Sequence, residues 1–418
     1  MTTRLYYHDS FLYDFDAEVR EVANSPRPAL ILDRSAFYPT SGGQIHDTGW
    51  LTSASGKLRV TEVADAEDGR VVHYIEAERD FDKGSLKPGT RVRGQIDATR
   101  RRDHMQQHSG QHVLSAAFIR LFNIPTVSFH MADDYCSIDL DISDLDTPTL
   151  TKEQVESAER LANEIILENR PVNVSYVTRD EAGKLGLRKL PPTERDELRI
   201  IDIHDFDLTA CGGTHVNQTG QIASVLLRKT EKVRQGWRVE FVAGQRAVAT
   251  ARRDFTMLSE TAALFSANIY DVPTQARKAL DEIKSLRKQR EQSLEELAAA
   301  HAATLLAETP KQSSRKLIVR TFADRDLNFL KLLAQKVTRQ APNAIALLAT
   351  TSPQPSLIFA QSAGQPHDMG ALLKETMAKL GGRGGGTKDM AQGGVPSANG
   401  LEDALAQVAG KLTETPAV

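Results

Sequence analysis

Residues 107–113 have the sequence QHSGQHV, which places His108 and His112 four residues apart. On an α-helix, side chains at this spacing project from the same face, so both imidazoles can reach one ligand. Apolar residues at helical spacing follow the pair and predict a helix over residues 103–122, with the histidines near its N-terminal end. Alone, the pair is a weak signal, because most histidines in proteins are structural.

A second pair follows about a hundred residues later, where TACGGTHV at 209–216 repeats the spacing with Cys211 and His215. Three imidazoles and one thiolate form a ligand set suited to tetrahedral Zn²⁺. Closed structural zinc sites rely more on cysteine, and four protein ligands leave a tetrahedral ion no position for water. Two roles therefore stay open. The metal activates water or polarises a carbonyl, or it orients the substrate while another group positions the water.

Two enzyme classes with related motifs do not fit. The His-Glu-x-x-His motif of metalloproteases needs a glutamate as general base directly after the first histidine, and that position is Ser109. A DHH-type phosphoesterase needs an Asp-His-His run, and the nearest approach to it is the tripeptide DHM at 103–105.

The composition is typical of a folded protein in a reducing compartment. At 418 residues the chain is too long for one ordinary core, which predicts two to four domains. The only cysteines are Cys136 and Cys211, which argues against a disulfide framework and fits the cytoplasm. No apolar run reaches the length of a membrane span, and the first residues lack a signal-peptide pattern. The net charge of −3 does not indicate nucleic-acid binding, although a basic face is compatible with it.

Residues 1–95 are predicted to form a small β-barrel. Short alternating apolar stretches recur between turn residues, and short strands at regular spacing hide their edges by closure. Within this region, the segment 36–49 contains the turn SGGQ at 41–44. Its two glycines allow a close backbone approach, so the turn is either a tight hairpin or part of a binding site.

Residues 96–243 predict an α+β domain, and residues 244–310 predict a helical arm. Thr151 and Gln154 are spaced as a capping box at the start of a long amphipathic helix. In the arm, apolar residues recur near heptad spacing but Arg290 interrupts them, which favours a helical arm or hairpin over a long dimeric coiled coil. The oligomeric state, monomer or homodimer, stays open.

Residues 311–418 predict a small α/β domain that contains the run GGRGGG at 381–386. Glycine runs are flexible linkers in most proteins, but inside a compact α/β unit a backbone turn that contacts phosphate is a competing interpretation. A basic triplet, Arg100 to Arg102, precedes the first histidine pair. Such a triplet usually forms a solvated face, but beside a metal pocket it is suited to hold a phosphate backbone.

Four segments together resemble one known family. LDRSAFYPTSGGQIHDTG at 32–49 is similar to a glycine-rich barrel segment, QQHSGQHVLSAAF at 106–118 to a first zinc motif, and TACGGTHV to a second. The family is that of the trans-acting alanyl-tRNA editing proteins, AlaX, related to the editing domain of alanyl-tRNA synthetase. GGRGGG resembles the DHHA1-type domain that ends the long form of these proteins. The resemblance covers nearly the whole chain, and the motifs occur in the family's order.

The resemblance implies an α+β multidomain protein with an N-terminal barrel, a zinc-containing editing domain, a helical arm and a C-terminal DHHA1-type domain. It also implies a zinc-dependent hydrolase that deacylates tRNA(Ala) mischarged chiefly with serine, with glycine as a second candidate. One Zn²⁺ per chain would be held by His108, His112, Cys211 and His215.

The implied site also assigns roles to residues outside the metal ligands. Gln44 and Ser35 are the catalytic candidates. Ser35 stands where many members carry threonine at a position associated with serine recognition, so this departure keeps a hydroxyl and bears on selectivity. The substrate-binding candidates are Ser41, Gly42, Gly43, Arg100 and Arg101. The basic triplet, the helical arm and the C-terminal domain are candidates for shape-based contact with tRNA.

Because the chain begins directly at the barrel, without the aminoacylation core of the synthetase, we expect editing in trans and no DNA or membrane partner. A site built to bind a serine hydroxyl rejects alanine, because its own polar groups would be left unpaired. The rival enzyme function is editing of Ser-tRNA(Thr), since threonyl-tRNA synthetase carries a similar editing domain. The rival from another class is a tRNA-binding module with a structural zinc and no catalysis.

Overall fold

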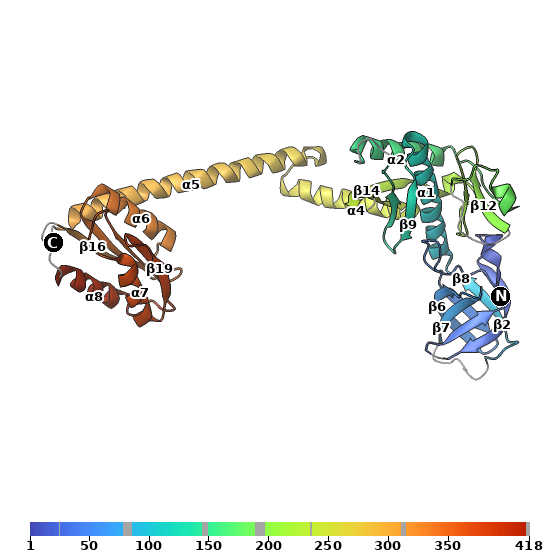
Figure 1. The fold of residues 1–418 in the computed structure, drawn as a ribbon, viewed down its shortest axis with the longest axis horizontal. Coiled ribbons are helices and arrows are strands. Elements are labelled where there is room, and N and C mark those ends of the chain that lie inside the picture. Colours follow the sequence, from blue (N-terminus) through green and yellow to red (C-terminus); the bar gives the residue numbers. More distant parts are fainter. Residues whose placement is uncertain are drawn as a thin grey trace. The chain divides into compact units, whose positions relative to one another are not determined.

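The computed structural model describes residues 1–24, 26–77, 86–143, 149–188, 197–234, 236–310 and 315–414. The chain divides into two compact units, Met1–Glu260 and Thr261–Val418 (Figure 1). No helix among the described residues is long and apolar enough to cross a membrane. The mixed α+β architecture with several domains agrees with the prediction.

The first unit begins with a closed barrel, as predicted. Its strands run in the order β2-β3-β7-β6-β5-β8, so each strand is paired on both sides and the edges are satisfied. The strands are β2 (Asp14–Ala23), β3 (Ala29–Leu32), β5 (Gly49–Ser53), β6 (Gly56–Asp65), β7 (Val71–Ala77) and β8 (Arg91–Ile96). Two further short strands, β1 (Thr3–Arg4) and β4 (Arg34–Ser35), pair in parallel with each other. In the sequence, β1 precedes β2, and β4 lies between β3 and β5.

A long helix, α1 (Ala98–Phe122), follows the barrel and begins five residues before the predicted start at 103. Asp97 explains the earlier start, because its side chain accepts hydrogen bonds from the backbone N–H groups of Thr99 and Arg100. The residues from His104 to Phe118 are buried on every side of the helix. An apolar stripe therefore indicates only part of what this helix buries.

Two antiparallel sheets and α2 complete the α+β part of the first unit, with strand orders β14-β15-β10-β9 and β11-β12-β13. α2 (Lys152–Leu167) begins with the predicted capping box, and α3 is confined to Arg179–Ala182. β9 pairs with β10 in one antiparallel hairpin, and β14 pairs with β15 in another. The strands are β9 (Thr126–Met131), β10 (Cys136–Leu140), β11 (Val172–Thr178), β12 (Glu197–Ile203), β13 (Asp207–Ala210), β14 (Val225–Val233) and β15 (Gly236–Ala243).

The helices α4 (Gly244–Leu264) and α5 (Val272–Glu308) come next, and the second unit starts within α4. The C-terminal part of α5 packs Ala298 and Ala302 into the core with α6, whereas Leu280 on its N-terminal part is 67% exposed. The helical arm and the domain boundaries at 95, 243 and 310 stay predictions.

The second unit has a five-stranded mixed sheet in the order β16-β17-β18-β20-β19 with helices on its faces (Figure 1). This matches the predicted α/β domain. The elements are β16 (Lys316–Phe322), α6 (Leu327–Gln340), β17 (Ala344–Thr350), β18 (Ser356–Gln361), α7 (Met369–Leu380), β19 (Arg383–Gly386), β20 (Met390–Gly394) and α8 (Leu401–Glu414).

The GGRGGG run is neither a linker nor a turn, because it forms the edge strand β19 paired with β20. A Cβ at Gly384 would lie 2.6 Å from the Cα of Gly393, and one at Gly386 would lie 2.2 Å from the carbonyl oxygen of Met390. These two glycines are therefore required by the close approach of the two strands. A Cβ at Gly385 would meet no atom within 4 Å. Close packing therefore explains Gly384 and Gly386 without a phosphate ligand, but it does not explain Gly385.

Candidate metal centre and adjoining cavity

The structure brings the four predicted metal ligands together. His108 and His112 lie on successive turns of α1, and Cys211 and His215 come from the loop that follows β13. One donor atom from each residue lies within 4.8 Å of all the others. The cluster therefore forms from two segments that are distant in the sequence.

Two of the donor–donor distances fit a tetrahedral metal ion. The Sγ atom of Cys211 lies 3.4 Å from Nε2 of His108 and 3.4 Å from Nε2 of His215. In a tetrahedral zinc site, with Zn–N and Zn–S bonds of about 2.0–2.3 Å, neighbouring donor atoms are about 3.3–3.6 Å apart. The spacing and the nitrogen–sulfur donor set both match Zn²⁺.

Gln44 fixes the orientation of His108. Its Oε1 atom lies 2.7 Å from Nδ1 of His108, and its amide donates to the hydroxyl of Thr214. The backbone N–H of Thr214 also donates to Oε1 of Gln44. Because Gln44 is fully buried, it acts on the cluster through His108, as a positioning residue.

Asp207 fixes the orientation of His112 in the same way. One carboxylate oxygen of Asp207 lies 3.3 Å from Nδ1 of His112, and both oxygens accept hydrogen bonds from Arg188. Burial would raise the pKa of Asp207, but the hydrogen bond to His112 and the charge of Arg188 hold it below its usual value. Asp207 is therefore an ionised anchor that leaves Nε2 of His112 for the cluster.

The third imidazole is oriented by Ser109. The Ser109 hydroxyl lies 3.2 Å from Nδ1 of His215 and accepts a hydrogen bond from the backbone N–H of Val216. All three histidines thus have an outward partner at Nδ1 and present Nε2 to the cluster.

Cys211 has the electrostatics of a metal-ligating thiolate. Burial alone would raise the pKa of its thiol, but the imidazoles of His108 and His215 hold that pKa well below the usual value. Arg199 supports the same loop, since its guanidinium donates to the carbonyl oxygens of Cys211 and Gly213. A Cβ at Gly213 would lie 2.1 Å from Cε1 of His108, so this position of the loop requires glycine.

A cavity of about 260 Å³, here called the cluster cavity, opens beside the metal ligands. Besides His108, His112 and Cys211, its lining includes Gly42, Gln111, Thr126, Phe129, Arg188 and Thr209. The predicted SGGQ turn reaches this cavity through Gly42. Gly43 has φ +82°, and a Cβ there would lie 2.3 Å from the carbonyl oxygen of Phe129, so the turn packs directly on β9. The turn is thus both a tight hairpin and a wall of the site.

The other predicted site residues lie away from the cavity. Ser41 is exposed at the turn. Arg100 is partly exposed and donates to the carbonyl oxygen of His46, so its contact with tRNA stays a prediction. Ser35 is fully buried, with its hydroxyl 2.7 Å from Nε2 of His73 and accepting from the backbone N–H of Phe37. Both printed partners of Ser35 belong to the barrel rather than to the cluster.

The prediction that Arg101 binds substrate is wrong. Its side chain is fully buried and forms an ion pair of 2.5 Å with Asp47. It also donates to the carbonyl oxygens of Ser10 and Ala36. The residue therefore joins α1 to the barrel, and a phosphate cannot reach it.

The positioning residues Ser109, Arg188, Asp207 and Thr214 were not predicted as site residues. Asp207 precedes the second motif and Thr214 lies within it, both within four residues of Cys211, so an unassigned carboxylate or hydroxyl near a ligand was the available signal. Arg188 gave none, because it lies nineteen residues before Asp207 in a segment without a recognisable motif.

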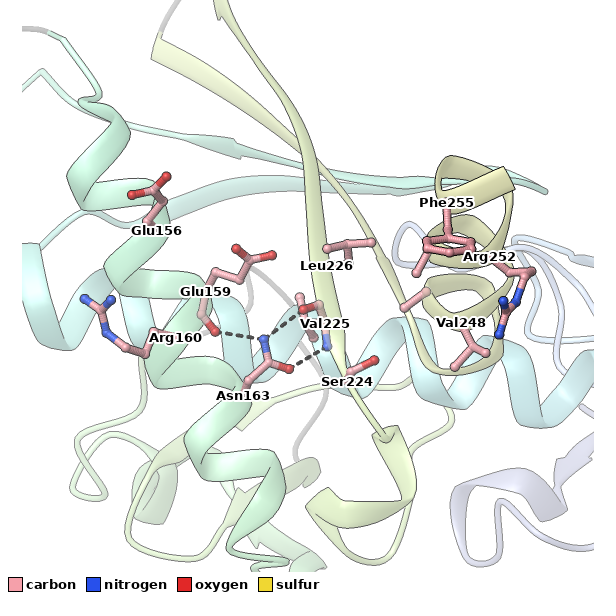
Figure 2. A pocket seen from close by; sticks show the side chains of 12 residues that line it. Glu156, Glu159, Arg160, Asn163, Ser224, Val225, Leu226, Val248, Arg252 and Phe255 are labelled. Carbon is pink, nitrogen blue, oxygen red and sulfur yellow. Dashed lines mark hydrogen bonds between the residues drawn. The ribbon is translucent and has the colours of Figure 1, made fainter. Parts of the chain in front are cut away.

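A larger cavity of about 1120 Å³ lies among α2, β14 and α4 (Figure 2). Asn163 connects two of these elements, since its amide donates to the carbonyl oxygen of Val225 and accepts from the Val225 N–H. Val248 and Phe255 on α4 face the cavity and are 57% and 50% exposed, respectively. Among the described residues, its lining contains none of the cluster ligands. The smaller cluster cavity is therefore the candidate site.

Three family descriptions match parts of the chain. Residues 3–100 match "tRNA synthetases class II (A)", residues 198–239 match "Threonyl and Alanyl tRNA synthetase second additional domain", and residues 314–414 match the DHHA1 domain. A solved C-Ala domain of alanyl-tRNA synthetase from Aquifex aeolicus matches 25% of this chain and 98% of its own at 18% identity. Its TM-score of 0.24 is too low to support an argument about the fold.

Two kinds of curated relative match nearly the whole chain. The alanine–tRNA ligase of Archaeoglobus fulgidus is 32% identical over 97% of this chain, but the match covers only 43% of that enzyme. The chain thus spans less than half the length of the ligases it matches. The alanyl-tRNA editing protein AlaX-L of Pyrococcus horikoshii is 30% identical over 94% of this chain and 95% of its own length. With both chains matched almost from end to end, the protein belongs to the AlaX-L family of alanyl-tRNA editing proteins.

Proposed function

We propose that this protein hydrolyses the ester bond of tRNA(Ala) mischarged with serine, and also with glycine, in trans. The observation that carries the proposal is the cluster of four donors beside a small cavity, in a chain of this family. His108, His112, Cys211 and His215 are the proposed ligands of one Zn²⁺. When bound, the ion would supply Lewis-acid polarisation of the ester carbonyl.

The residues of the chain support this function in three ways. Gln44, Asp207 and Ser109 hold the three imidazoles in fixed orientations, so the site needs no reorganisation when substrate arrives. A cavity of about 260 Å³ suits a small amino acid. Gln111 and Thr209 supply polar groups to its lining, and polar groups left unpaired by alanine would favour a hydroxylated substrate.

The direct test uses purified protein with Ser-tRNA(Ala), Gly-tRNA(Ala) and Ala-tRNA(Ala), each with and without a chelator. We expect serine to be released fastest, glycine more slowly, and alanine hardly at all, with the chelator suppressing every rate. Complete stability of all three esters would contradict the proposal.

Two alternatives have their own outcomes in the same assay. Faster release of serine from Ser-tRNA(Thr) than from Ser-tRNA(Ala) would favour threonyl-tRNA editing, which the match to a domain of both synthetases allows. Tight tRNA binding without any deacylation would favour a non-catalytic module with a structural zinc. In that case Cys211→Ala would lower zinc content without changing any hydrolytic rate.

A further inference from the structure

A third cavity, here called the outer cavity, shares the lining residue Arg188 with the cluster cavity. Its volume is about 840 Å³. Gln111 and His112 on α1 line the cluster cavity, and Ala116 and Ile119, one to two turns further along the same helix, line the outer cavity. The two spaces therefore lie in sequence along one rigid element.

The strand β13 and Arg188 connect the same two cavities. Asp207 and Leu208 line the outer cavity, whereas the next residues of the strand, Thr209 and Ala210, line the cluster cavity. Arg188 lines both, and its ion pair with Asp207 holds it at their junction. A ligand that occupies both cavities would therefore pass beside Arg188.

The volumes of the two cavities indicate that they bind different parts of one substrate. Sites for small molecules usually have volumes of about 300–1,000 Å³. The cluster cavity, at about 260 Å³, falls below this range, while the outer cavity lies within it. The cluster cavity can take a small acyl group, but the larger group to which that acyl group is esterified must lie elsewhere.

We propose that the outer cavity binds the terminal nucleoside of the aminoacylated RNA, with the base stacked on Arg120. This inference rests on the proposed function and names where its substrate lies. Arg120 donates hydrogen bonds of 2.9 Å to the carbonyl oxygens of Phe206 and Asp205, and its guanidinium lies 4.8 Å from the centre of the Phe206 ring. A planar cation held in this way is a preformed stacking platform, and RNA-binding proteins stack bases on arginine.

The polar groups of the outer cavity match a nucleoside. The carboxylate of Asp202 can accept hydrogen bonds from ribose hydroxyls, and the amide of Asn123 can both donate to and accept from a base edge. Ala116, Ile119 and Leu208 supply apolar surface for the base. The lining carries three carboxylates, Asp202, Asp205 and Asp207, and two guanidinium groups, Arg120 and Arg188. This excess of acidic groups disfavours a phosphate inside the cavity, so the nucleoside is the part of the RNA terminus that fits.

The test compares two serine esters that share the acyl group and differ in the leaving group, namely 3′-O-seryl-adenosine and serine methyl ester. For the wild type we expect a lower KM for the adenosine ester. Arg120→Lys keeps the charge and removes the plane, and should raise the KM for the adenosine ester roughly tenfold with kcat unchanged. Neither parameter for the methyl ester should change.

Leu185→Trp tests the same space without touching the carbonyl contacts of Arg120. Leu185 lines the outer cavity and is 44% exposed, so a larger side chain can be accommodated by the fold. It should also raise only the KM of the adenosine ester. Arg160→Lys, an exposed arginine on α2, is the matched control and should change neither substrate.

Failure of the inference differs from failure of the proposed function. If the wild type deacylates Ser-tRNA(Ala) but both variants keep the wild-type KM for seryl-adenosine, the outer cavity does not bind the nucleoside. If no ester is hydrolysed at all, the proposed function fails. Equilibrium binding of a non-hydrolysable serylamido analogue of adenosine then decides on the cavity: binding that Leu185→Trp weakens supports it, and binding that the variant leaves unchanged overturns it.

Discussion

His104 lies one helical turn before His108 on α1 and is fully buried. Neither of its ring nitrogens has a hydrogen-bond partner among the described residues. Burial, together with the nearby charges of Arg100 and Arg246, lowers the pKa of His104 to about 2. The residue is therefore a neutral imidazole whose burial costs stability without a compensating hydrogen bond.

This burial predicts a specific pH dependence. Between pH 6.5 and about 2 the unfolded chain binds a proton at His104 that the folded protein does not, so folding stability falls as the pH falls through this window. At pH 5 the loss is about 2 kcal/mol relative to pH 8. His104→Leu should remove this loss in urea unfolding curves recorded at both pH values. The exposed-site control His204→Gln should keep the wild-type dependence, and parallel curves for wild type and His104→Leu would contradict the assignment.

Gln44 gives a second prediction at the scale of one residue. Gln44→Met keeps the approximate volume but removes the acceptor for Nδ1 of His108. Loss of such a partner lowers metal affinity by about 10–100-fold. Zinc affinity measured by competition with a chelator should show this loss, while Gln95→Met on the exposed face of β8 should keep the wild-type affinity. Equal affinities for the two variants would exclude the positioning role.

The sequence was sufficient to find the donors and Gln44, but not the other groups that orient the donors. The four-residue spacing of His108 and His112 is meaningful because α1 is a helix, and the second pair supplied a thiolate. By contrast, Arg188 acts through Asp207, 19 residues further along the sequence, and Asp207 contacts His112 across 95 residues. Arg101 shows the opposite error, since a basic triplet has the same composition whether its middle member is solvated or buried against Asp47.

At the scale of elements, the ion pair of Arg101 with Asp47 joins α1 to the barrel. Arg101→Met would leave the buried Asp47 carboxylate without its partner. Removal of one partner from a buried pair costs about 3–5 kcal/mol. Denaturant unfolding should show this loss, whereas Arg102→Met, at the exposed neighbouring position, should stay within about 0.5 kcal/mol of the wild type. A small effect of Arg101→Met would mean that the barrel is held in place by other contacts.

The edge strand β19 allows a test with adjacent glycines. An alanine at position 386 would place its Cβ against the carbonyl oxygen of Met390, whereas one at position 385 would meet no atom within 4 Å. Gly386→Ala should destabilise the second unit by about 1–3 kcal/mol, as overpacking does. Gly385→Ala should be neutral within about 0.5 kcal/mol. Thermal unfolding of the two variants tests this steric account. If the run instead bound phosphate, Gly385→Ala would weaken RNA binding, which a binding assay would show.

The fold itself was largely predictable at this scale. Alternating stretches indicated the barrel, and the capping box at Thr151 marked the start of α2. Among the strands that were missed, β13 and β19 are four residues long, and β19 is rich in glycine. Pairing with a neighbour, rather than intrinsic preference, makes such segments extended.

At the scale of the whole molecule, all four donors and their positioning partners lie in the first unit. A chain that ends after Leu264 should therefore keep its zinc affinity within about threefold of the full chain, because distant sites act independently. With the DHHA1 domain absent, the KM for Ser-tRNA(Ala) should rise while that for seryl-adenosine stays unchanged. An equal rise for both substrates would show that the second unit shapes the cluster cavity itself.

The barrel contributes Gln44 and Gly42 to a centre whose donors all come from the domain that follows it. Residues 1–95 therefore cannot be exchanged as an independent module without altering the coordination environment of His108. With a metal ion bound, the reverse would also hold, because the ligand field of the ion would depend on how the barrel docks. The visible absorption spectrum of Co²⁺ bound in the cluster would therefore report on the docking of the barrel. This spectrum should shift when Arg101 or Gln44 is replaced, although neither residue would contact the ion.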